Sequence, residues 1–174
     1  MSKTSGFVLT LALVFVSGSA LAAPPKLDEA AWTAVFGTAA DGPSPTYIKE
    51  LREDMSPAEA GAVFKGAEKP SKFGFAKLNV KGVPGVKKME IYFAKDKETK
   101  KVPTFLKSVT LTLDASVLKD AAAYDALIKV LTAKYGPIKK AEDVPNYKVT
   151  WALKSMRVAQ VWKIGRDLTF KFSL

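Results

Sequence analysis

The sequence predicts an α+β domain in which an antiparallel sheet of about six strands carries helices on one face. In residues 105–114, Val109, Leu111 and Leu113 alternate with serine and threonine side chains, which is the period-two pattern of a half-buried strand. Residues 120–136 then repeat apolar side chains every three or four positions, as one face of an α-helix does. A helix followed by three strands occurs twice, which is typical of helices packed on one face of an antiparallel sheet. A tandem repeat of this unit is one interpretation of the pattern.

The helical part of the chain is expected at residues 27–66. A first helix over residues 27–36 has Asp28 as its N-cap, and residues 47–54 are expected to form one or two further turns. Ser56, Pro57 and Glu59 then stand in the order of a capping box, with Ser at the N-cap, Pro at N1 and Glu at N3. This signal predicts a helix that begins after Ser56 and ends at Gly66.

The first strand set is expected at residues 72–114. Phe73 and Phe75 have the opposite parity from Leu78 and Val80, which predicts a β-bulge near residues 76–77. The next two strands have clean alternation, around residues 89–93 and 105–114.

The second half repeats the order. In the central helix, 120–136, Asp120 is the expected N-cap and Gly136 the expected stop. Residues 138–146 are expected to be a charged connector, and residues 147–174 form the second strand set. Its last strand places four apolar side chains on one face, namely Leu168, Phe170, Phe172 and Leu174.

Residues 1–22 have the features of a secretory signal peptide. Lys3 precedes an apolar run over residues 7–16, and residues 20–22 form a small-x-small cleavage site. An uncleaved membrane anchor is the alternative. We therefore expect residues 23–174 to be a single domain of a periplasmic or secreted bacterial protein, with no integral membrane span after cleavage. The pattern does not indicate an oligomeric state.

The composition excludes several classes of enzyme. The chain has no histidine and no cysteine, which rules out Ser-His-Asp and Cys-His sites, thiol redox chemistry and the usual zinc ligand sets. Carboxylates are the remaining candidates for hydrolytic chemistry, at Glu50, Glu53 and Asp54 and at Glu142 and Asp143. Solvated surface positions explain these clusters better. We expect a protein that is not an enzyme and that holds no cofactor and no metal.

Positive charge is concentrated in the predicted strands. The chain carries a formal net charge of +10, and residues 65–107 hold 12 basic and 4 acidic side chains, whereas residues 24–64 hold 3 and 7. We expect a basic, partly aromatic sheet face that binds an anionic envelope component or an acidic protein. Nucleic acid is disfavoured by export and by the lack of a recognition motif. The candidate contacts are Lys88, Tyr92, Lys107, Lys163 and Lys171. The alternative is that these lysines keep an exposed sheet soluble and protect its edges.

Two segments carry a resemblance to known families. Residues 55–64, 124–137 and the order of elements resemble small exported bacterial domains of the β-lactamase-inhibitor-protein-like group and of the outer-membrane assembly small lipoproteins. The chain has neither the lipobox cysteine of the second group nor the disulfide cysteines of the first. The resemblance implies that a sheet face binds proteins. The alternative function for this chain is a protein inhibitor or envelope-assembly accessory that recognises one defined partner by shape.

Overall fold

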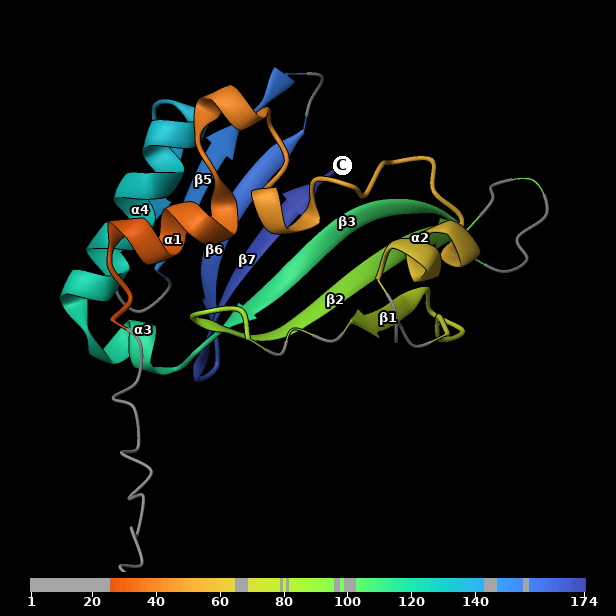
Figure 1. The fold of residues 1–174 in the computed structure, drawn as a ribbon, viewed down its shortest axis with the longest axis horizontal. Helices are drawn as coiled ribbons and strands as arrows, with labels where there is room; N and C mark the ends of the chain where they lie inside the picture. Colours follow the sequence, from red (N-terminus) through yellow and green to blue (C-terminus); the bar gives the residue numbers. More distant parts are fainter. Residues whose placement is uncertain are drawn as a thin grey trace, which may run out of the picture.

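The computed structural model describes residues 26–64, 69–78, 80, 82–95, 98, 103–142, 147–154 and 157–174. The predicted signal peptide lies outside the described residues. Within them, the chain is a mixed α+β fold with a seven-stranded antiparallel sheet (Figure 1). The strands are β1 (Phe75–Leu78), β2 (Val86–Lys95), β3 (Pro103–Leu113), β4 (Lys140–Glu142), β5 (Lys148–Ala152), β6 (Val158–Ile164) and β7 (Asp167–Ser173). The sheet thus has one strand more than expected, because β4 forms inside the segment predicted to be a connector.

The N-terminal helices begin where their caps predict. In α1 (Glu29–Phe36), the Asp28 carboxylate accepts a hydrogen bond from the backbone N–H of Ala31 at 3.1 Å. Before α2 (Pro57–Val63), the Ser56 N–H donates to the Glu59 carboxylate at 2.7 Å, and the Glu59 N–H donates to the Ser56 hydroxyl at 3.3 Å. The capping box is therefore confirmed. The predicted stop at Gly66 lies outside the described residues, and the turns expected at 47–54 reduce to a 3₁₀ turn, Thr46–Ile48.

The central helix is α4 (Ala121–Tyr135). The Asp120 carboxylate accepts from the backbone N–H groups of Ala122 and Ala123, as the N-cap prediction requires. At the other end, Gly136 has φ 84° and donates its N–H to the Thr132 carbonyl at 2.9 Å. This left-handed conformation favours glycine, which is why the helix ends there. A one-turn helix that was not predicted, α3 (Ser116–Lys119), precedes it.

The strand order is β1-β2-β3-β7-β6-β5-β4. Each half of the chain forms an antiparallel meander, and the last strand of each half, β3 and β7, pairs with the other at the centre of the sheet. This order suits a tandem helix–strand unit, which stays a prediction. The predicted bulge near residues 76–77 is wrong, because β1 pairs with β2 without a register shift. Three register shifts lie instead between β2 and β3, and at the one between Tyr92 and Phe93 the extra residue is Lys107.

Aromatic side chains connect the helices to the C-terminal strands. The Phe36 ring of α1 meets the Phe170 ring edge-on at 4.8 Å between centroids, and Tyr135 of α4 lies within 6.5 Å of Phe170 and 6.2 Å of Phe172. Trp151 is fully buried, and its Nε1 donates to the Thr132 hydroxyl at 3.3 Å. Figure 1 shows α1 and α4 beside the blue C-terminal strands and α2 beside the green β3, in agreement with these contacts. None of the helices in the described part of the chain combines the length and the apolar character needed to cross a bilayer.

Candidate binding face

One face of the sheet is built from the side chains that alternate with the core. In β2, for example, Met89, Ile91 and Phe93 are buried, and Glu90 and Tyr92 point to the other side. We call this side the polar face. Across its centre it comprises Phe75, Lys77, Lys88, Glu90, Tyr92, Ser108, Thr110, Thr112, Gln160, Trp162, Thr169, Lys171 and Ser173.

The strand register brings three of the five predicted contact residues to this face. Tyr92 lies opposite Ser108, which lies opposite Ser173. Lys171 lies opposite Thr110. Lys88 lies opposite Thr112, one pair further along the strands. The centre of the face is therefore rich in hydroxyl groups, with the lysines at intervals.

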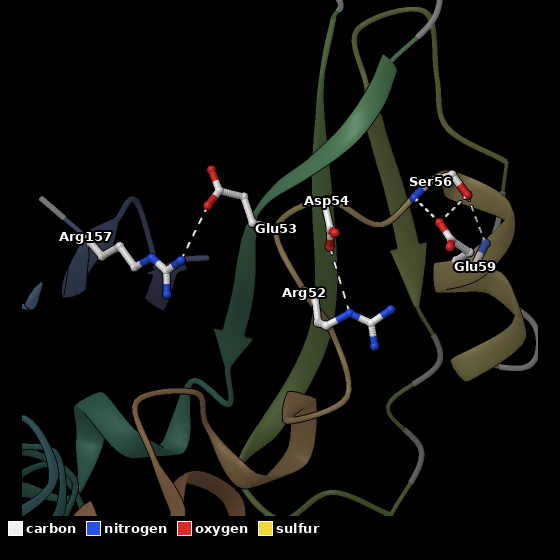
Figure 2. A network of polar contacts seen from close by, with 6 residues as sticks. All are labelled: Arg52, Glu53, Asp54, Ser56, Glu59 and Arg157. Carbon is white, nitrogen blue, oxygen red and sulfur yellow. Dashed lines mark hydrogen bonds and ion pairs between the residues drawn. The ribbon is translucent and has the colours of Figure 1, made fainter. Parts of the chain in front are cut away.

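Lys107 is not one of the paired residues of the polar face. It is the extra residue of the bulge, and its ammonium contacts the Glu53 carboxylate at 2.6 Å. The other oxygen of Glu53 lies 3.4 Å from Nη2 of Arg157, and Figure 2 shows Glu53 reaching Arg157 from the segment that precedes α2. The hydrogen bond from Lys107 and its charge hold the pKa of Glu53 below its usual value. Lys107 thus joins the segment before α2 to the sheet, and its expected place on the basic face is corrected.

Lys163 also differs from the expectation. It lies opposite Leu168, which is fully buried, so its side chain leaves the sheet on the core side. Its ammonium lies 5.8 Å from the centroid of the Tyr147 ring, a cation–π arrangement. The expectation that Lys163 lies on the basic face is therefore wrong, and the β6–β7 register assigns its neighbour Trp162 to the polar face, opposite Thr169.

The polar face carries less free positive charge than the composition indicates. Lys88 pairs with Glu90 at 2.7 Å, and Lys140 of the edge strand β4 pairs with Glu142 at 2.7 Å. Both pairs are partly exposed, so each adds little to stability. They do affect the electrostatic field of the polar face. Because two of the lysines have a carboxylate beside them, the attraction of this face for a distant anion is weaker.

An exposed aromatic patch lies at the β1 end of the sheet, and the sequence analysis missed it. We define the aromatic patch as Phe73, Phe75, Tyr92 and Phe105. The three phenylalanines are 65%, 45% and 44% exposed. Phe75 lies opposite Tyr92, with ring centroids 4.9 Å apart, and Phe105 lies opposite Ala94, one polar-face position beyond Tyr92.

The sequence held a signal for this patch. Phe75 and Lys77 have the same parity, and Ala76 and Leu78 form the alternative apolar set, which is buried. An uninterrupted strand with Lys77 facing solvent would have placed Phe75 outward. Predicting a bulge instead kept both phenylalanines on the inner face.

The candidate catalytic carboxylates do not converge. Glu53 pairs with Lys107 and Arg157, and Glu142 pairs with Lys140. Asp54 pairs with Arg52 (Figure 2), and its carboxylate oxygen lies 3.8 Å from Nε of Arg52. Asp143 lies outside the described residues. In the part of the chain that the structure describes, there is no group of three or more acidic, histidine or cysteine side chains that could hold a metal ion.

Comparison with protein-family models, with curated proteins and with solved structures found no match for this chain. The geometry of the polar face and the aromatic patch is therefore the basis for the function proposed below.

Proposed function

We propose that this protein is an exported binding protein, without catalytic activity, that recognises a protein partner through the aromatic patch on its polar face. The observation that carries the proposal is the exposure of Phe73, Phe75 and Phe105 at the β1 side of the sheet, with Phe75 and Phe105 paired to the neighbouring β2 residues Tyr92 and Ala94. Large apolar side chains gathered on a surface are typical of sites that bind another macromolecule.

Aromatic side chains suit this role for energetic reasons. A phenylalanine or tyrosine contributes a large contact area and loses little conformational entropy when it is buried. Aromatic anchors of this kind carry most of the binding free energy at protein interfaces. The pairing of Phe75 with Tyr92 holds two rings in place before a partner arrives.

The rim of the patch is basic. Lys72 places its ammonium 5.0 Å from the Phe73 ring centroid, and Lys77 and Lys95 are exposed in the adjoining strands. A partner with acidic side chains around an apolar centre would complement this arrangement. An extended anionic polymer fits less well, because the polar face itself holds the ion pairs of Glu90 and Glu142.

We infer that the helices all lie on the core side of the sheet and leave the polar face accessible to the partner. The contacts of α1 and α4 with Phe170 and Phe172 support this arrangement for the C-terminal half. Export to the periplasm or the medium follows from the signal-like residues 1–22. The resemblance to small exported bacterial domains likewise implies binding of proteins through the open face of the sheet.

The test is affinity capture from bacterial envelope extracts, with washes at low and then at high salt. Three tagged proteins are compared: wild type, Phe75→Ser with Phe105→Ser, and the control Ile164→Ser. Ile164 is 54% exposed at the end of β6, so the control removes a similar apolar side chain away from the patch. Equal melting temperatures by circular dichroism would establish that all three proteins are folded.

We expect wild type and the control to retain one protein through the high-salt wash, and the double variant to lose it. Loss of all bound material at high salt from all three proteins would contradict recognition through the patch and would favour charge-led binding of an anionic component. Absence of any retained protein at low salt would contradict the proposed function itself.

A further inference from the structure

A cavity that shares no residue with the aromatic patch has the chemistry of a small-molecule site. Its volume is about 460 Å³, within the range of ligand pockets. It lies between the loop after α1, the last turn of α4 and the segment that joins β5 to β6. The lining residues are Ala39, Gly42, Pro43, Lys134, Tyr135, Ala152, Leu153, Lys154 and Arg157.

Three of the lining side chains are cations, and none of those that the structure describes in the lining is a carboxylate. Lys134 is 7% exposed, and its ammonium donates to the backbone carbonyls of Thr38 and Gly42 at 2.9 and 2.8 Å. These bonds hold the loop after α1 against α4. They use two of the three ammonium donors, and the Asp41 carboxylate of the same loop is close enough to interact with the ammonium charge.

The other two cations stand at the opposite wall. Arg157 bonds Glu53 through Nη2 at 3.4 Å, and a guanidinium has five donors in a planar fork. Lys154 is exposed beside Leu153. The wall therefore offers donors with positive charge to an anionic group, next to the buried charge of Lys134.

The remainder of the lining is apolar. Ala39 and Pro43 come from the loop, and Ala152 and Leu153 come from the end of β5. A ligand that satisfies both parts has one anionic group and an apolar body. We propose that this cavity, formed by Lys134, Lys154 and Arg157 around an apolar floor, binds a small organic carboxylate. The site is independent of the aromatic patch and of the function proposed for it.

Benzoate is a suitable probe, because benzamide has nearly the same shape and no charge. Each is titrated into isotope-labelled protein, and amide chemical shifts are followed by NMR. Benzoate is expected to give saturable shifts at Ala39, Gly42 and Leu153, with benzamide binding at least about tenfold more weakly, as the loss of one charge-assisted contact implies.

Two variants locate the site. Lys154→Gln is expected to weaken benzoate binding about tenfold. Lys163→Gln removes an equal charge from the Tyr147 side of the sheet, and benzoate affinity is expected to stay unchanged. Lys154 is exposed and has no role in the core, so its variant is expected to fold normally.

Three outcomes would overturn the proposal. Equal affinities for benzoate and benzamide would show that charge plays no part. Equal weakening by both variants would show non-specific attraction to a basic protein. Absence of saturable shifts at millimolar benzoate would show that the cavity is not a carboxylate site.

Discussion

Replacing Gly85 with alanine is expected to destabilise the protein by two separable effects. Gly85 precedes β2 with φ +70°, and its backbone lies against the ring of Trp32. An added Cβ would contact Cη2 of that ring, would lie 2.8 Å from Cζ3, and would lie 3.0 Å from Cδ2 of Leu27. Trp32 has little freedom to retreat, because it is fully buried and its Nε1 donates to the Ala123 carbonyl at 3.0 Å.

The magnitude follows from these two effects. Alanine in a left-handed conformation costs about 1–2 kcal/mol relative to glycine. Overpacking against a fixed ring adds about 1–3 kcal/mol. Trp32→Phe removes the two ring atoms that the new Cβ meets. In that background Gly85→Ala should cost only the conformational part, about 1–2 kcal/mol, although Trp32→Phe is itself destabilising.

A double-mutant cycle measures the difference. Equilibrium urea unfolding is followed by far-ultraviolet circular dichroism, since the tryptophan signal changes between variants. The control is Gly82→Ala, where φ is +83° and no atom lies within 4 Å of the added Cβ. Its cost should be the same with Trp32 or Phe at position 32. Additivity of Gly85→Ala and Trp32→Phe within about 0.5 kcal/mol would refute the reasoning.

Two further predictions concern buried and charged groups. The Tyr135 hydroxyl is buried and has no hydrogen-bond partner among the described residues. Tyr135→Phe should therefore leave the stability measured by thermal unfolding unchanged or raise it by up to about 1 kcal/mol. A clearly lower melting temperature would indicate that the hydroxyl is hydrogen-bonded. The pKa of Glu53 is lowered by Lys107, so its contribution to stability is present above the unfolded pKa and is lost as the pH falls through the folded pKa. Glu53→Gln should therefore lower the melting temperature near neutral pH and make it less dependent on pH on the acid side. Glu50→Gln is the matched control, and identical acid-side profiles for wild type and Glu53→Gln would contradict the assignment.

The caps and the long periodic elements could be predicted because their determinants are local. The hydrogen bonds of Asp120 and of the Ser56–Glu59 box join residues no more than three positions apart, so the residue types are enough to recognise them. The alternation in β2, β3 and β7 is equally local, because the sequence of each strand alone shows which alternate side chains are buried.

The candidate face could be predicted only in part. Lys88, Tyr92 and Lys171 were recognised because their strands have clean alternation. Phe75 was missed because the opposite parity of Phe75 and Leu78 in this short strand was interpreted as a bulge, which the pairing of β1 with β2 contradicts. The cavity around Lys134 had no signal in the sequence, because its lining residues come from positions 39 to 157.

The N-caps of α1, α2 and α4 and the buried side chains of the long strands could be read from the sequence alone, because those properties depend on near neighbours. Which cation pairs with which carboxylate, and on which side of the sheet each of these side chains lies, depends on residues that are far apart in the sequence. Lys107 pairs with Glu53, 54 positions away, at the bulge where it is the extra residue of β3. Long-range register, which no local pattern encodes, sets the surface that a partner would meet.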